Sequence, residues 1–235
     1  MADIITAPQH KMICENLNFA AKEAFKRLRT NVIMSLEDAE NKCRVVGVTS
    51  AQPTEGKSTV ALNLAFSIAE LGKKVLLIDA DMRRSSLHVK TELNREPGLS
   101  DLLTTTNSIA TVIQKYVNTK EGDTTSFDMI SGGVDVSNPS ELLDSKRMSN
   151  LLQALAAAYD YIIIDLPPVG AVIDAVPVSQ RTDGMIVVLR ENNCPRNVLE
   201  DCVSQLRLAK VNILGFVVNG AVEGAGKKYQ YNKYY

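Results

Sequence analysis

Short apolar runs alternate with amphipathic stretches along most of this chain of 235 residues. Runs such as VLLI, YIII and MIVVL scarcely alternate between apolar and polar residues, which is expected of strands covered on both faces. The pattern predicts strands at 44–49, 74–78, 126–130, 161–164, 184–189 and 213–218. Apolar residues at helical spacing predict helices at 57–71, 145–158 and 196–209. This order indicates an α/β fold with a mostly parallel, twisted sheet flanked by helices.

The two ends of the chain differ from this alternating centre. Phe25, Leu28 and Val32 recur at helical spacing and predict an amphipathic helix over 19–36. The last nine residues, KKYQYNKYY, are basic and tyrosine-rich and have no periodicity, which is typical of a flexible tail. We therefore expect a single domain over 1–235, with an N-terminal helical region in 1–40 and a tail at 227–235.

Composition narrows the classes of partner. A net charge of −1 and a pI near 6.2 give no bulk attraction to nucleic acid, so no nucleic-acid partner is expected. The four cysteines form no Cys-x-x-Cys pair, and the chain has only two histidines, so reduced thiols in a cytoplasmic protein are expected. No stretch approaches the roughly 18 apolar residues that span a bilayer. Work at a membrane would then need a partner.

The stretch VTSAQPTEGKST, residues 48–59, predicts a phosphate-binding loop of the P-loop nucleotide hydrolase type. It follows a predicted strand, and Gly56-Lys57-Ser58-Thr59 opens a predicted helix, so backbone N–H groups and the helix dipole favour an anion there. Lys57 would reach the β- and γ-phosphates, and the Ser58 hydroxyl would bind Mg²⁺. Ala51 replaces the usual first glycine, which is tolerable, whereas an alanine at Gly56 would not be.

Three carboxylates follow predicted strands. Asp79 and Asp81 come after one apolar run, and Asp165 comes after another. Taken singly, an aspartate after a strand is more often a turn residue or a cap than a ligand. Because the carboxyl ends of parallel strands share one edge of the sheet, the three acids are expected to converge on the loop. With GKST upstream, they predict a site for Mg²⁺ and a nucleotide.

These motifs resemble those of the bacterial tyrosine autokinases that accompany capsule and exopolysaccharide synthesis, a branch of the deviant-Walker P-loop proteins. PTEGKST resembles the Walker A motif of that family, VLLIDADMRR its second motif and YIIIDLPP its Walker B motif. Thr54 stands where the family usually has glycine, and Ser85 where proline is common. The resemblance covers nearly the whole chain and implies an ATP-dependent protein-tyrosine kinase.

The resemblance also implies roles for individual residues. Lys57, Asp79 and Asp81 would be catalytic, with Asp79 accepting the tyrosine proton and Asp81 orienting the metal shell, although these two roles could be exchanged. The residues implied to bind ATP are Thr54, Glu55, Gly56, Lys57, Ser58 and Thr59. The residues implied to bind Mg²⁺ are Ser58, Asp79, Asp81 and Asp165.

Further expectations concern assembly and partners. EAFKRLRTN resembles the family's oligomerisation motif, placed on Glu23, Lys26 and Arg29, with lysine replacing the middle arginine. It implies a ring-like homo-oligomer in which one subunit phosphorylates the tail of another. The implied acceptors are Tyr229, Tyr231, Tyr234 and Tyr235. A transmembrane activator that recruits the chain to the inner face of the membrane and a cognate tyrosine phosphatase are also implied, with control of polysaccharide synthesis and export as the outcome.

Two other functions remain open. A partition-type or division-site ATPase, as in the MinD and ParA families, would share the loop, but Gln52 occupies the position of their signature lysine. The near-neutral charge and the lack of a terminal amphipathic membrane helix also argue against it. The other alternative is a nucleotide-gated scaffold that regulates a membrane polysaccharide polymerase.

Overall fold

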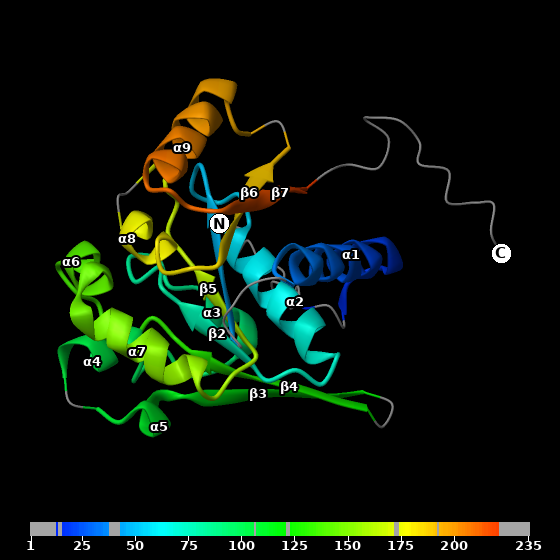
Figure 1. The fold of residues 1–235 in the computed structure, drawn as a ribbon. Helices are drawn as coiled ribbons and strands as arrows, with labels where there is room; N and C mark the ends of the chain where they lie inside the picture. The colour runs from blue at the N-terminus through cyan, green and yellow to red at the C-terminus, as the bar shows by residue number, and fades with distance from the viewer. Residues whose placement is uncertain are drawn as a thin grey trace, which may run out of the picture.

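The computed structural model describes residues 13, 16–37, 43–105, 107–120, 123–171, 174–191 and 193–220, and these contain a seven-stranded sheet (Figure 1). The strands are β1 Arg44–Ser50, β2 Val75–Asp79, β3 Gln114–Lys120, β4 Asp123–Ile130, β5 Tyr161–Asp165, β6 Gly184–Arg190 and β7 Ile213–Asn219. Their order across the sheet is β3-β4-β2-β5-β1-β6-β7. All neighbours are parallel except β3 and β4. The expected α/β fold with a mostly parallel sheet is confirmed.

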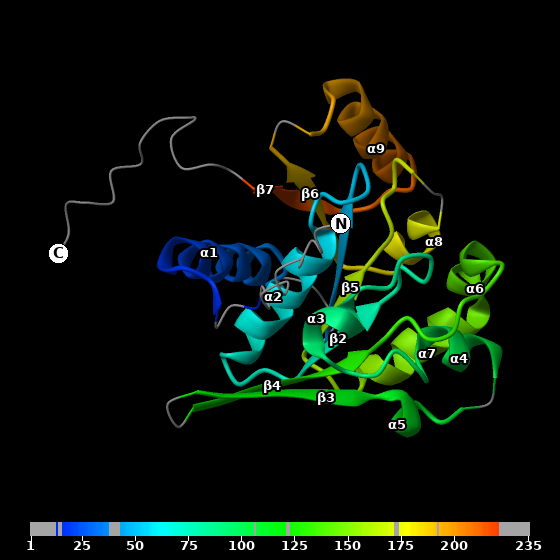
Figure 2. The ribbon, with the colours of Figure 1, turned by 180° about the vertical axis from the view of Figure 1, so that it is seen from behind.

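Helices cover both faces of this sheet (Figures 1 and 2). One face is covered by α1 Phe19–Ser35 and α2 Lys57–Ala69. The opposite face is covered chiefly by α7 Lys146–Ala156, α8 Ala175–Ser179 and α9 Arg196–Leu208. The remaining helices are the short segments α3 Leu87–Thr91, α4 Leu99–Thr104, α5 Ile109–Val112 and α6 Pro139–Asp144.

The central strands are buried on both sides, which explains their unbroken apolar runs. In β5, Ile162 and Ile164 pack into the core beneath α7, α8 and α9, whereas Ile163 packs into the core beneath α2. The strands β2 and β6 divide their side chains in the same way. Burying both faces of a strand favours apolar residues at every position, so periodicity is lost while hydrophobicity remains high.

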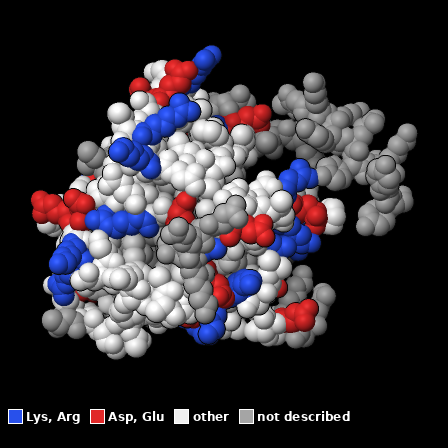
Figure 3. All heavy atoms as spheres, viewed as in Figure 1, with Lys and Arg blue, Asp and Glu red and all other residues white. Residues whose placement is uncertain are grey.

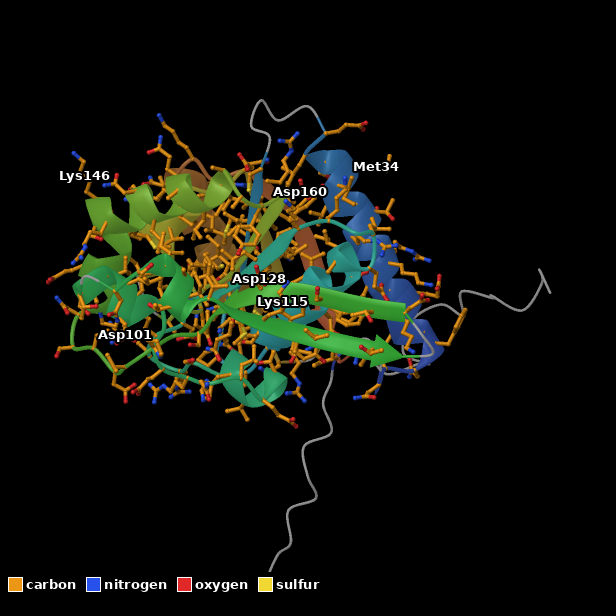
Figure 4. All side chains as sticks on the ribbon, turned by 90° about the horizontal axis from the view of Figure 1, so that it is seen from below. Met34, Asp101, Lys115, Asp128, Lys146 and Asp160 are labelled. Atoms are coloured by element: carbon orange, nitrogen blue, oxygen red, sulfur yellow. The ribbon has the colours of Figure 1, made fainter. Side chains whose placement is uncertain are left out.

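The β3–β4 hairpin is the main difference from the predicted fold. Periodicity identified 126–130, but β4 begins at Asp123 and β3 was missed, because QKYVNTK is mostly polar. The polar strand β3 is held by its pairing with β4, and the Tyr116 and Phe127 rings stack across this pair with centroids 5.0 Å apart. Lys115 Nζ lies 3.8 Å from Asp128 Oδ1 across the hairpin, and both are labelled in Figure 4.

Helix α1 is attached to the C-terminal end of α2. Asn18 caps α1 by accepting the backbone N–H of Ala21 at 2.9 Å. Arg29 Nη1 donates to the carbonyl of Ser67 at 2.6 Å and lies 3.6 Å from a carboxylate oxygen of Glu70. Of the helices in the described ranges, none has the length and apolar character needed to cross a bilayer.

The start of α7 offers a simple test of the fold. Ser145 Oγ accepts the backbone N–H of Met148 at 3.2 Å and so satisfies one of the otherwise unpaired donors of the first turn. Ser145→Ala is expected to lower the free energy of unfolding by about 1 kcal/mol in urea titrations. The control is Ser204→Ala, at an exposed position inside α9, which should be neutral or slightly stabilising. Equal effects of the two substitutions would contradict the capping role.

Candidate nucleotide site

A pocket of about 810 Å³ opens at the carboxyl ends of the strands, where the predicted phosphate-binding loop joins β1 to α2. The loop itself, the segment after β2, residues 167–171 and the ends of β6 and β7 line this pocket. Its charged lining residues are mostly cations, with Asp81 as the one carboxylate among the described residues. By contrast with this mostly cationic lining, the molecular surface in Figure 3 shows basic and acidic side chains together in small mixed groups. The pocket is therefore locally suited to an anion.

The turn into α2 depends on Gly56. Its φ of +96° lies in the left-handed region, and it directly precedes Lys57 at the first turn of the helix. A Cβ added at Gly56 would lie 1.9 Å from the side-chain nitrogen of Asn219, which closes the space behind the loop. The sequence-based statement that alanine is not tolerated here therefore has both a conformational and a steric cause.

The two residues before Gly56 shape the loop in different ways. Thr54 has a φ of +65°, which explains why glycine is common at this position in the resembling family. The side chain of Glu55 is fully buried and does not line the pocket, which leaves its backbone for the implied contact with ATP. Its carboxylate accepts the backbone N–H of Gln52 at 2.8 Å, and its carbonyl accepts the Asn219 amide at 3.0 Å. Glu55 thus shapes the loop from within.

Lys57 is held by two carboxylates at the floor of the pocket. Its Nζ lies 2.8 Å from a carboxylate oxygen of Asp81 and 3.4 Å from Oδ1 of Asp165. Burial alone would lower the pKa of Lys57, but Asp165 and Asp81 outweigh it and raise the pKa above its ordinary value. Lys57 is therefore a fixed positive charge at the start of α2.

Asp79 and Asp165 face each other on neighbouring strands and are both fully buried. Burial, and then the neighbouring Asp165 carboxylate, raise the pKa of Asp79 to about 7. Burial also raises the pKa of Asp165, whose Oδ2 has no hydrogen-bond partner within the described part of the chain. The Lys57 ammonium acts on both carboxyl groups and opposes part of the rise in their pKa values.

The carboxylate of Asp79 is used by the loop that follows β2. Oδ1 accepts the backbone N–H of Asp81 at 3.2 Å, and Oδ2 accepts the Ser85 hydroxyl at 2.8 Å. Oδ2 also accepts the backbone N–H groups of Ser86 and Leu87, at 3.1 and 3.2 Å, at the start of α3. Of the two acids, Asp81 lines the pocket, whereas Asp79 is fully buried beneath it.

The site suits a magnesium-bound phosphate ester. The left-handed turn at Gly56, the ammonium of Lys57 and the unpartnered Oδ2 of Asp165 supply a cradle, a cation and a free oxygen ligand. No group of three or more His, Cys, Asp or Glu in metal-binding arrangement occurs among the described residues. Mg²⁺ does not need such a group, because it keeps several waters and binds through one or two protein oxygens and substrate phosphates.

The other predicted site residues fall into two groups. Glu23 and Lys26 pair with each other on the exposed side of α1, with 2.8 Å between Nζ and Oε1, while Arg29 is bound to α2 as described. The tyrosines expected to accept phosphate, at positions 229, 231, 234 and 235, lie outside the described residues.

Sequence reasoning missed several pocket residues, among them Lys90, Arg190 and Asn219. Asn219 directly follows the apolar run ILGFVV, so the rule that identified Asp79 and Asp165 could have found it. Arg190 ends β6 and pairs with Asn219 in the sheet. Lys90 lies on the short helix α3, which carries no sequence signal.

The packing at Gly56 leads to a prediction. Gly56→Ala is expected to weaken nucleotide binding by roughly tenfold or more, because the substitution strains the turn and displaces Asn219. Gly72→Ala is the matched control, since Gly72 also has a positive φ, of +73°, but open space around its Cβ position. The control should lose about 1 kcal/mol of stability and keep full affinity in calorimetric titration. Unchanged affinity in Gly56→Ala would contradict this account of the loop.

The buried acid pair predicts a pH dependence. Because the pKa of Asp79 is about 7 in the fold and about 3.9 in the unfolded chain, the native state binds more protons between those values. Stability contributed by protonated Asp79 is fully present below about pH 4 and is lost as the pH rises to about 7. Between about pH 5 and 8, the nucleotide-free wild type should therefore lose more unfolding free energy than Asp79→Asn. Parallel pH profiles in urea titrations would show that Asp79 does not titrate in this range.

Two proteins with similar sequences are named tyrosine-protein kinases. A family model described as an AAA domain matches residues 43–212. Tyrosine-protein kinase ptk of Acinetobacter johnsonii is 35% identical over 205 residues, 87% of this chain but 27% of that protein. Tyrosine-protein kinase YwqD of Bacillus subtilis is 36% identical over 209 residues, 89% of this chain and 85% of that protein. The chain thus spans a small part of one relative and most of the other.

Solved structures agree with these relatives. The kinase domain of Escherichia coli tyrosine kinase ETK matches with a TM-score of 0.79 at 35% identity, covering 90% of this chain and 80% of that one. The cell division ATPase MinD of Pyrococcus furiosus matches with a TM-score of 0.60 at 22% identity, over 77% and 74% of the two chains, which shows a shared fold alone. The AAA-domain match and the extensive similarity to YwqD show that this protein belongs to the bacterial tyrosine-protein kinase family.

Proposed function

We propose that this chain is an ATP-dependent protein-tyrosine kinase, in which the pocket at the ends of the strands binds ATP and Mg²⁺. The observation that carries the proposal is that Lys57, Ser58 and Asp81 line this pocket, with Asp165 directly behind them. A phosphoryl-transfer site needs chiefly positioning and compensation of negative charge, and this arrangement supplies both.

The binding roles follow from the geometry. The backbone N–H groups of the loop and the N-terminus of α2 would hold the phosphates, with Lys57 at their β/γ end. The Ser58 hydroxyl and the Asp165 carboxylate would hold the magnesium ion, directly or through water. When bound, that ion offsets negative charge on the phosphates during transfer.

Asp81 changes its role when nucleotide binds. In the described conformation the Asp81 carboxylate pairs with Lys57. A bound phosphate group would replace Asp81 as the partner of Lys57. Asp81 would then be free to accept the proton of a tyrosine hydroxyl as the phenolic oxygen bonds to the γ-phosphorus and ADP leaves. A phenol has a pKa of about 10, so a carboxylate needs to activate it less than it would a serine. Asp79 meanwhile fixes the loop that carries Asp81.

The acceptors are proposed to be Tyr229, Tyr231, Tyr234 and Tyr235 on a neighbouring copy in a ring-like oligomer. The exposed pair Glu23 and Lys26 on α1 is available for contacts between copies, whereas Arg29 is already bound to Ser67. We further propose that a transmembrane activator recruits the chain to the inner face of the membrane and that a cognate phosphatase resets it. The motif resemblance supports this setting and an output in capsule and exopolysaccharide synthesis and export.

The activity is tested by mass spectrometry of the protein after incubation with ATP and Mg²⁺. Phosphate should appear on tyrosines between 229 and 235, and Lys57→Met should abolish it because the substitution removes the cation at the phosphates. Lys146→Met, at an exposed position on α7, should retain it. Release of ADP without protein phosphorylation would favour an ATPase of the MinD type, and tight binding without turnover would favour a nucleotide-gated scaffold.

Transfer between copies needs a separate mixture. One partner carries Lys57→Met and an intact tail, and the other carries an intact site with all four tail tyrosines changed to phenylalanine. Phosphate on the Lys57→Met chain can come only from the other copy. Its absence, in a mixture whose wild-type control is phosphorylated, would restrict the reaction to a single chain.

A further inference from the structure

Lys90 is a pocket residue to which the proposed function assigns no role. It lies on α3, and its side chain lines the same pocket as Lys57 and Ser58. The start of α3 is fixed by the Asp79 carboxylate, which accepts the N–H groups of Ser86 and Leu87. Lys90 is therefore carried by a segment tied to the floor of the site rather than by a free surface loop.

The ammonium of Lys90 has no hydrogen-bond or ion-pair partner among the described residues, unlike the side chains of Lys57 and Arg83. Lys57 is paired with Asp81, and Arg83 Nε lies 2.6 Å from an oxygen of Asp174. Lys90 is also half-buried, and this burial lowers the pKa of its side chain. A partly buried, unpaired cation costs folding free energy, so its presence in a binding pocket points to an anion supplied by the ligand.

The position of Lys90 indicates which part of a nucleotide it faces. After burial, the groups that act on its charge are Asp165 and Lys57, the residues at the phosphate end of the loop. Arg190 and Asn219, in contrast, contact the loop at the carbonyls of Thr54 and Glu55, before the turn. Lys90 thus lines the same pocket as Lys57 and Ser58 and is influenced by the charges at the phosphate end of the loop.

We propose that Lys90 contacts the terminal phosphate of the bound nucleoside triphosphate and supplies, from α3, a second cation beside Lys57. The proposal rests on the proposed function and adds a residue to the same site. In the transfer, the bond from the γ-phosphorus to the β–γ bridging oxygen breaks, the bond to the phenolic oxygen forms, and the phenolic proton passes to Asp81. Lys90 stays an ammonium throughout and offsets charge on the γ-phosphoryl oxygens. The partition-type ATPases have a signature lysine at the position of Gln52, and the uncharged Gln52 cannot act as a second cation here. In this proposal Lys90 of the same chain supplies that second cation.

The test compares the affinities of ATP and ADP, measured by calorimetry with Mg²⁺ present. Lys90→Met should weaken ATP binding by about tenfold and ADP binding by less than about twofold, because the lost charge-assisted contact is to the terminal phosphate. Lys90→Arg should retain most of the preference for ATP. The control Lys146→Met, on the outside of α7 in Figure 4, should match the wild type.

Several results would overturn the proposal. Equal losses for ATP and ADP, no loss for either, or an equal loss in Lys90→Arg and Lys90→Met would each exclude a charge contact to the terminal phosphate. Thermal unfolding of the nucleotide-free variants identifies any substitution that merely disturbs α3. Because the readout is binding, it remains decisive even if the wild type phosphorylates no tyrosine, so failure of the kinase assignment and failure of the Lys90 contact are distinguishable.

Discussion

The compensation of two buried carboxylates by one ammonium is the interaction on which the rest of the structure depends. Asp79 and Asp165 end neighbouring strands at matching register, so the sheet itself brings two acids together without access to water. Lys57, at the start of α2, is the cation that makes this tolerable. To place Lys57 beside these acids, the loop before α2 has to turn sharply at the edge of the sheet. The positive φ of Gly56 and the buried side chain of Glu55 are consistent with such a turn.

The three acids of the site do different work although they look alike in the sequence. Asp79 accepts four hydrogen bonds from the segment after β2 and acts as a structural anchor for that segment. Asp81 faces the pocket and holds Lys57. Asp165 lies behind both with one oxygen unpartnered. Asp79, at the end of β2, can therefore fix the segment that follows, while Asp81, two positions later, remains available for chemistry.

Sequence patterns predicted the central strands, the long helices and the convergence of Lys57 with the strand-end acids, because these depend on local periodicity and on one rule about parallel sheets. They missed β3, whose stability comes from pairing with β4 rather than from its own composition. They also did not reveal that the Glu55 side chain turns into the protein interior, since a loop motif gives the order of residues but not the direction of their side chains. Lys90 could not be found, because its place in the pocket arises from a contact between α3 and Asp79 that no local pattern encodes.

The hydrogen bond from Arg29 to Ser67 connects α1 to helix α2, and α2 begins at the phosphate-binding loop. Helix α2 has 13 residues, about 20 Å in length, with Lys57 at one end and Ser67 in its last turn. It is buried along nearly its whole length, so it cannot bend to absorb a displacement at either end. The position of α1 and the position of the ammonium of the site are thus linked through one buried helix.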